Sequence, residues 1–384
     1  MIIAKLKAYW PLGLTLIFYL LLGGFYLLHH DWNFSAFSVI GPTTGFAQHF
    51  SDDNLYIIDE DPRGYDGRFF YFLSRAPFDL GTATDLLASP IWRYQRIFYP
   101  FLIYLLSLGG VAWLVNLWLP FVNLIAITLG TYFFIKLLQF QKIKNYFSLF
   151  FSLSPALIFG FLYNLGEPLA FALVVLAVYN FIKDRLGLAV WFLILAGLTK
   201  ETTLFVSFGF IIYFLVNRPN HYLKKILLFS LPALIFTIWI VILVLIFGYA
   251  SFLNPAGGNL VAPFLGMWLK AKVFLTQHWF YQLSDALFYL SFLLGAWYFL
   301  SETFKRLDFF NLIGLLYTVF AFTFSIHLLL FPKEYARHFF GFHLFLLLSY
   351  LATRRRLALA ALLIYLSTSA FYLFEFLILL DFFR

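Results

Sequence analysis

The segment that organises this chain reads Asp59-Glu60-Asp61-Pro62-Arg63-Gly64-Tyr65-Asp66-Gly67-Arg68-Phe69-Phe70-Tyr71. It lies in the only long polar stretch of an otherwise apolar sequence, because residues 31–96 hold nine of the eighteen acidic residues and five arginines. One apolar run precedes this stretch and about ten follow it. A charged, turn-rich loop between a first membrane helix and a bundle is where water-facing chemistry can occur, and we expect Asp66 to carry it.

The composition indicates a membrane protein. Of the 384 residues, 63% are hydrophobic and 11% are charged, whereas a soluble domain carries about 25% charged residues. Repeated apolar runs of about twenty residues match the roughly 30 Å hydrocarbon core of a bilayer. Inside lipid the backbone must satisfy its own hydrogen bonds, so these runs are expected to be helices. We therefore predict an all-α, polytopic integral membrane protein.

The net charge of +8 does not indicate a nucleic-acid partner, because the basic residues are scattered between apolar runs. The chain has no cysteine, which excludes disulfides, thiol chemistry and Cys-ligated metals. Lys5 and Lys7 precede the first apolar run, 9–28, and no small-residue cleavage site follows it. We therefore expect an uncleaved first span rather than a signal peptide.

The number of spans depends on residues 96–108, an apolar piece that is short for a span and ends at Gly109 and Gly110. If this piece does not cross, the basic clusters at 136–144, 218–225 and 354–356 fall on the cytoplasmic side with the N-terminus, as the positive-inside bias requires. We therefore predict a surface-lying or half-inserted helix here, and about eleven spans in the inner cell membrane. The predicted spans are 9–28, 111–138, 145–163, 167–182, 186–199, 202–217, 225–248, 277–300, 309–331, 338–352 and 357–380.

The first loop, 29–95, is predicted to be extracytoplasmic and to contain a short amphipathic helix at 65–76. Its aromatic face is expected to meet lipid, while its charged face meets water or headgroups. The aromatic face comprises Phe69, Phe70, Phe72 and Leu73, and the charged face comprises Asp66, Arg68 and Arg75.

This topology gathers further ionisable residues on the outer face, where charges at membrane depth are costly and often functional. Together they can line one polar cavity suited to an anionic lipid carrier, with its phosphate bound by Arg or Lys and a carboxylate acting as general base. Besides Asp66, these residues are Arg93, Arg96, Glu167, Lys200, Glu201, Lys333, Glu334, Arg337 and His338.

Several candidates also have a purely structural interpretation. Asp66 can be a solvated loop residue or a helix cap, and Glu167 can simply favour the dipole of a helix N-terminus. Lys200 and Glu201 can form a surface turn. The remaining alternatives are interfacial snorkelling for Lys333 and Arg337, and a solvated loop or weak cation site for Asp52, Asp53 and Asp59–Asp61. No motif has metal-ligand spacing.

Four motifs occur in an order that resembles the C-type (GT-C fold) membrane glycosyltransferases, especially bacterial relatives with a Tyr-Asp-Gly-x-Phe-Tyr first loop. They are Gly64-Tyr65-Asp66-Gly67-Arg68-Phe69-Phe70-Tyr71, Arg93-Tyr94-Gln95-Arg96-Ile97-Phe98-Tyr99-Pro100, Gly166-Glu167-Pro168-Leu169 and Leu198-Thr199-Lys200-Glu201-Thr202. The resemblance covers about residues 9–217, within a single transmembrane domain over 1–384. The C-terminal helices of 218–384 look generic.

The resemblance implies a polyprenyl-phosphate-linked sugar donor, a first-loop acid as catalytic base and an amphipathic helix lying along the membrane. Asp66 matches the base position best. Many members carry paired acids where Gly67 follows Asp66 here, so Asp59–Asp61 stay open as alternatives. Metal dependence varies in the superfamily, so no cofactor is predicted and a divalent cation is left undecided.

We therefore expect an inverting glycosyltransferase that acts at the extracytoplasmic face on a lipid, glycan or protein acceptor, in contact with membrane lipids. Asp66 is its expected base, and Glu167 orients the acceptor or sugar. The donor phosphate is expected at Arg337, Lys333, Lys200 or Arg96, and the rest of the substrate site is Arg68, Arg93, Glu201 and His338. Two alternatives are a lipid-linked-sugar flippase or transporter, which would show charges midway through spans, and a non-catalytic membrane protein of envelope assembly.

Overall fold

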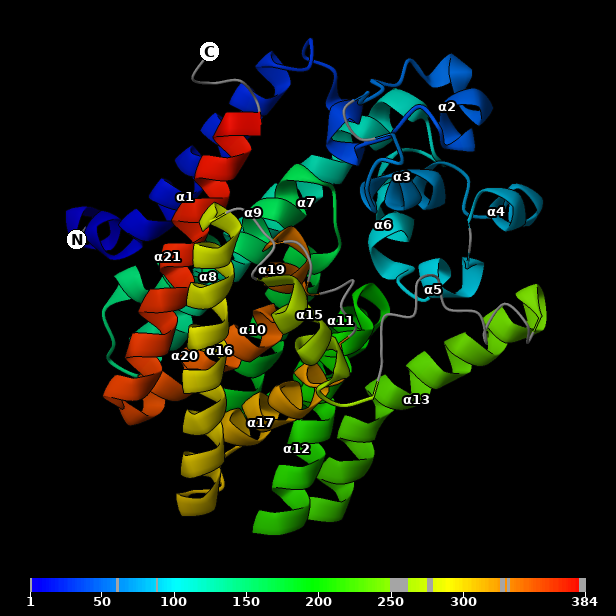
Figure 1. Cartoon of the computed structure of the whole chain (residues 1–384). Coiled ribbons are helices and arrows are strands. Elements are labelled where there is room, and N and C mark those ends of the chain that lie inside the picture. Colours follow the sequence, from blue (N-terminus) through cyan, green and yellow to red (C-terminus); the bar gives the residue numbers. More distant parts are fainter. Residues whose placement is uncertain are drawn as a thin grey trace. The chain divides into compact units, whose positions relative to one another are not determined.

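The computed structural model of the chain describes residues 2–59, 62–87, 89–248, 262–274, 279–324, 329 and 332–379 (Figure 1). Within these residues the regular secondary structure is helical apart from isolated bridge positions, among them a parallel bridge between Ile40 and Ile57. The all-α class is therefore confirmed. The chain divides into two compact units: unit 1 is Met1–Leu137, Leu157–Glu201 and Pro232–Ala256, and unit 2 is Leu138–Ala156, Thr202–Leu231 and Gly257–Arg384.

Four helices in the described part of the chain are long and apolar enough to cross a membrane, and a fifth span is possible if one bent pair counts as one. The pair, Asn145–Ser152 and Pro155–Leu162, bends by 51°. Several long apolar helices of this kind indicate a membrane-embedded protein. The four helices are α1 (Ile2–Leu28, apolar from Tyr9), α7 (Ala112–Phe140), α13 (Tyr222–Phe247) and α16 (Trp279–Lys305).

The predicted count of about eleven spans is not confirmed. Several predicted spans correspond to shorter apolar helices, such as α11 (Leu186–Thr199) and α12 (Leu204–Asn217), each with 14 residues. At 1.5 Å per residue such a helix is about 21 Å long, which is shorter than the roughly 30 Å hydrocarbon core.

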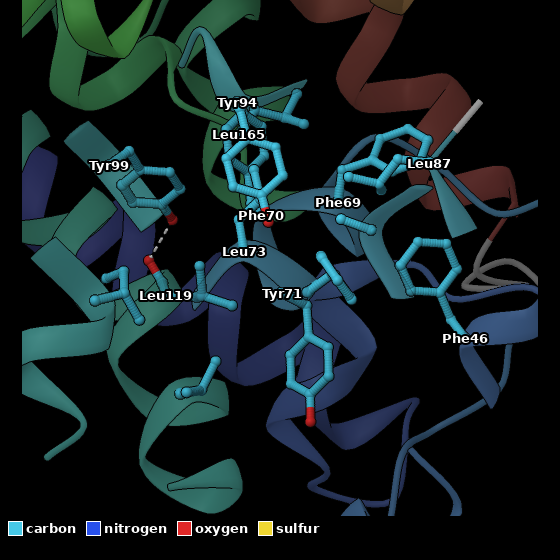
Figure 2. Close-up of a cluster of buried hydrophobic side chains, with 14 of the residues drawn as sticks. Phe46, Phe69, Phe70, Tyr71, Leu73, Leu87, Tyr94, Tyr99, Leu119 and Leu165 are labelled. Carbon is cyan, nitrogen blue, oxygen red and sulfur yellow. Dashed lines mark hydrogen bonds between the residues drawn. The ribbon is translucent and has the colours of Figure 1, made fainter. Parts of the chain in front are cut away.

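The first loop folds into short helices around a buried aromatic cluster in unit 1 (Figure 2). Its centre is α3 (Gly67–Arg75), the helix predicted at 65–76, which packs on α6 (Phe98–Leu106). The other helices of the loop are the α-helices α2 (Gly45–His49), α4 (Leu80–Leu86) and α5 (Pro90–Tyr94) and the 3-10 helices η1 (Phe34–Ser38) and η2 (Ser51–Asp53).

The predicted orientation of α3 was wrong, because its aromatic face is buried in protein and does not face lipid. Phe69, Phe70, Phe72 and Leu73 are all buried, and the Phe70 ring packs edge-on against Tyr99 with centroids 5.4 Å apart. Burying a Phe or Leu side chain contributes about 1.5–3 kcal/mol, so this face stabilises the loop as a folded module. Figure 2 also shows the Tyr99 hydroxyl donating to the Leu119 carbonyl at 2.8 Å.

Helix α6 is too short to cross a bilayer. Its nine residues extend about 14 Å, half of the hydrocarbon core, which agrees with a non-crossing segment at 96–108. Tyr99 and Ile103 are buried, while Phe101 and Leu105 on the other side are exposed. Gly109 and Gly110, both with positive φ, then lead into α7.

A helical hairpin completes unit 1. Helix α10 (Glu167–Ile182) packs along α11, which also touches α6. The turn before α10 follows α9 (Pro155–Leu162) and is held by Asn123 of α7, whose amide donates to the carbonyls of Gly160 and Leu165 at 3.1 and 3.0 Å.

Unit 2 is a separate helical bundle. Helix α16 packs on α21 (Arg356–Leu379) and α17 (Phe309–Ala321), and α17 packs on α12 and α20 (Phe340–Thr353). Small residues allow these contacts, since a Cβ at Gly314 would collide with the Phe299 ring. Unit 2 also contains the shorter helices α8 (Leu149–Ser152), α15 (Leu265–Phe274) and α19 (Pro332–His338), and the first part of α13 up to Leu231.

Candidate functional site

Two glycines fix the backbone on either side of Asp66. Gly64 has φ +63°, in the left-handed region, and a Cβ there would collide with the Val39 carbonyl oxygen. A Cβ at Gly67 would collide with the carbonyl oxygens of Tyr163 and Ser38. Glycine is the residue that tolerates both a positive φ and so close a backbone approach. The Gly-Tyr-Asp-Gly motif therefore packs a tight turn against two distant backbone segments and leaves Asp66 in a defined place.

The Asp66 side chain does not cap a helix. Asp66 occupies the N-cap position of α3, but it has αR dihedral angles and its side chain makes no capping hydrogen bond. The carboxylate Oδ1 instead lies 3.2 Å from Nη1 of Arg93, at the end of α5. The two side chains are 26% and 22% exposed, respectively. The helix-cap interpretation is therefore wrong, and the carboxylate is both oriented and accessible.

Two guanidinium groups lie on one aromatic ring beside this carboxylate. The Arg93 guanidinium carbon is 3.8 Å from the centroid of the Phe69 ring, and that of Arg68 is 4.6 Å from the same centroid. Such contacts stabilise a cation on the ring face. Phe69 thus holds Arg68 and Arg93 next to Asp66.

Arg96 and Glu201 form a two-bond ion pair between segments 105 residues apart. Arg96 Nε donates to Oε2 at 2.9 Å and Nη2 donates to Oε1 at 2.7 Å. Burial disfavours the charge of Glu201, but attraction to Arg96, the hydrogen bonds from Arg96 and the charge of Lys200 outweigh it. The pKa of Glu201 is therefore lowered from 4.5 to about 2. Burial likewise opposes the charge of Arg96, but Glu201 outweighs burial and raises the pKa of Arg96.

Lys200 and Glu167 form a buried ion pair. Lys200 Nζ donates to Glu167 Oε1 at 2.7 Å, and the two side chains are 3% and 2% exposed. The surface-turn interpretation of Lys200 is therefore wrong. Glu167 does lie in the first turn of α10, as the dipole interpretation requires, and Lys200 is an additional partner that contacts its carboxylate directly.

These three pairs form one group within unit 1, which we call the ion-pair cluster: Asp66, Arg93, Arg96, Glu167, Lys200 and Glu201. Lys200 and Glu201 are adjacent in the chain, and Arg96 interacts electrostatically with Asp66 and Glu167 as well as with Glu201. Six of the ten predicted site residues thus lie together. The cluster is closed at Lys200 and Glu167 and accessible at Asp66, Arg93 and Glu201. Chemically, it offers an accessible carboxylate beside cations.

The other predicted residues lie elsewhere or outside the description. Arg68 borders the cluster through Phe69, whereas Arg337 and His338 belong to α19 of unit 2. Arg337 is only 1% exposed, and its Nη1 lies 3.4 Å from Oε2 of Glu334, so the snorkelling interpretation does not fit it. His338 Nε2 is 3.8 Å from the same oxygen. The side chain of Lys333, and residues Glu60 and Asp61, lie outside the described part of the chain.

Sequence reasoning missed the hydrogen-bonded ion pairs of Asp53 and Asp285. Asp53, interpreted as solvated, accepts hydrogen bonds from the Tyr71 hydroxyl at 2.5 Å and from Arg75 Nε at 3.0 Å, which clamps its loop onto α3. Asp285 of α16 is buried with Lys270 Nζ at 2.7 Å and accepts a hydrogen bond from the Tyr335 hydroxyl at 2.8 Å. For Asp285 a signal existed, since it is an acid inside a predicted span.

No group of three or more His, Cys, Asp or Glu side chains that could hold a metal ion occurs among the described residues. No protein-family model, curated protein or solved structure matches this chain.

Proposed function

We propose that this membrane protein is a glycosyltransferase that moves a sugar from a polyprenyl phosphate to a hydroxyl acceptor, with Asp66 as general base. The acceptor oxygen attacks the anomeric carbon and the sugar–phosphate C–O bond breaks, so the stereochemistry at that carbon inverts. The acceptor proton passes to the Asp66 carboxylate, and the phosphate leaves with the bonding electron pair. A positioned base of this kind typically contributes about 10²–10⁴-fold to the rate.

One observation carries the proposal: the Asp66 carboxylate is accessible, held by Arg93 and not used as a helix cap. Gly64 and Gly67 fix the backbone around it. A structural acid at the start of α3 would be expected to bond to the helix amides. An acid that acts on a substrate would be oriented by a neighbouring side chain and would stay accessible, as Asp66 is beside Arg93.

The same geometry favours Arg93 and Arg68 as the donor-phosphate ligands. Arginine binds phosphate through charge-assisted hydrogen bonds, and Phe69 holds both guanidinium groups near Asp66. Lys200 is a poorer candidate because it is buried against Glu167. Arg96 is engaged by both oxygens of Glu201. We assign these two cations to holding the cluster together.

The test is release of free polyprenyl phosphate from a panel of polyprenyl-phosphate hexoses and pentoses by the full chain in nanodiscs, with lipid, glycan and peptide hydroxyl acceptors present. Asp66→Asn keeps the shape of the side chain but removes the base, so we expect release to fall about 10²–10⁴-fold with normal folding. Asp59→Asn is the matched control in the same loop and is expected to stay active. Activity retained by Asp66→Asn but lost in Asp59→Asn or Asp61→Asn would move the base within the loop. Parallel assays with and without EDTA decide whether a divalent cation is needed.

A transporter or flippase of lipid-linked sugars is the second candidate, because unit 2 carries the buried pair Lys270–Asp285 and its acid lies in the candidate span of α16. Ionisable groups at membrane depth often mark transport pathways. Proteoliposomes with a fluorescent lipid-linked sugar distinguish the two candidates. Movement between leaflets that Asp285→Asn abolishes, with no transfer product, would replace the transferase proposal. Neither transfer nor movement would favour the envelope-assembly role.

A further inference from the structure

An apolar groove of about 200 Å³ lies in unit 1 between the candidate membrane helices α1 and α7. Gly23 and Gly24 of α1 line one side, and Pro120 and Phe121 of α7 line the other. The groove is larger than the roughly 150 Å³ engineered cavity that stays dry and binds benzene. Its size and its apolar lining suit a hydrocarbon group rather than water.

The missing side chain of Gly24 contributes to the open volume. A Cβ at Gly24 would meet no heavy atom within 4 Å. One turn away, Leu20 also lines the groove and is 53% exposed, and Phe121 opposite is 41% exposed. The groove is therefore open at the outer surface of two helices whose length and composition suit a bilayer.

We infer that this groove binds one acyl chain of a bilayer phospholipid as a lasting part of the protein. The hydrocarbon around α1 and α7 in a membrane consists mainly of acyl chains, and no charged residue lines the groove to select a particular headgroup. An acyl chain that enters the groove from the bilayer is already in an apolar environment, so the hydrophobic effect does not favour its transfer. Its retention therefore depends on dispersion contacts with the rings and the helix backbone. This inference does not rest on the proposed transferase activity.

The test uses the full chain purified in detergent, with retained phospholipid counted by native mass spectrometry. Gly24→Leu fills the groove, and we expect it to lower phospholipid occupancy by about tenfold, equivalent to 1.4 kcal/mol. Gly13→Leu is the matched control, because Gly13 lies on the same helix, also has no heavy atom near its Cβ position and does not line the groove. Both changes remove a glycine from a helix and should raise helix propensity alike.

The binding site of the acyl chain is mapped with a phospholipid that carries a diazirine in one acyl chain. Labelling of 19–27 and 120–124, lost in Gly24→Leu and kept in Gly13→Leu, is the expected result. Equal loss in both variants, or no retained phospholipid in the unmodified chain, overturns the inference. Displacement of the labelled phospholipid by polyprenyl phosphate would show an isoprenoid occupant and overturn the acyl assignment.

Discussion

The ammonium nitrogen of Lys200 lies 2.7 Å from Oε1 of Glu167, and the protein covers both side chains almost completely. Glu167 begins α10 and Lys200 follows the end of α11, so the pair joins the two ends of the helical hairpin. Removing two charges from water costs several kcal/mol per ion, and their mutual attraction compensates only while both are present. This pair therefore makes each residue depend on the other.

The first prediction follows from that dependence. Lys200→Met leaves the Glu167 charge buried without its ammonium partner, and we expect the free energy of unfolding in mixed micelles to fall by about 3–5 kcal/mol. The double variant Glu167→Gln, Lys200→Met removes both charges and should recover most of this loss. A double variant as unstable as the single one would show that the pair does not act as a unit.

The second prediction concerns acid stability. The pKa of Glu201 is lowered to about 2 from 4.5, so the folded state favours the charged form. The resulting stabilisation is fully present above pH 4.5 and is lost as the pH falls through about 2. Glu201→Gln should therefore be less stable than the unmodified chain at pH 7, and the difference should shrink between pH 4.5 and 2. A difference that is constant with pH would contradict the charge argument.

The third prediction concerns the glycine beside Asp66. Gly67→Ala places a methyl group against the backbone carbonyls of Tyr163 and Ser38, which cannot move as a flexible side chain can. We expect a loss of about 1–3 kcal/mol in stability together with loss of transfer activity. Gly81→Ala in α4 is the matched control, since its nearest neighbour would be an Asp79 oxygen at 3.9 Å. That change should be neutral or stabilising by up to about 1 kcal/mol.

The fourth prediction concerns topology. The chain has no cysteine, so single cysteines can be introduced and labelled with an impermeant maleimide in intact cells. Position 59 in the first loop should be labelled from outside, and position 144 should be labelled only after permeabilisation. Outside labelling of position 144 would reverse the side assigned to every later segment.

Much of the cluster could be predicted from sequence because its members are charged residues in the polar first loop or at the ends of apolar runs. The pairing could not be predicted, since Arg96 and Glu201 are 105 residues apart and spacing carries no information about such a contact. The burial of Lys200 was missed for the same reason. In the sequence, a lysine between two short apolar helices is typical of an exposed turn. Only the packing of the helices shows that Lys200 is buried.

The prediction that the apolar face of α3 meets lipid was wrong for a different reason. Helical periodicity shows that Phe69, Phe70 and Leu73 share an apolar environment, but lipid and protein interior have the same apolarity. Only the packing of Phe46 and Tyr99 against this helix distinguishes the two. The role of Asp53 was missed because a carboxylate in a polar loop has no periodic pattern that marks its burial.

The packing around Gly67 has a thermodynamic consequence. Phe37 and Phe161 line the groove between α1 and α7, and Ser38 and Tyr163, one and two residues further on, supply the carbonyls against which Gly67 rests. A ligand that shifts either backbone segment changes the free energy of the other site, and this coupling is reciprocal. If an acyl chain in the groove raises donor affinity by some factor, bound donor raises affinity for that chain by the same factor. Under that condition the lipid composition of the bilayer would act as an effector of the proposed Asp66 site.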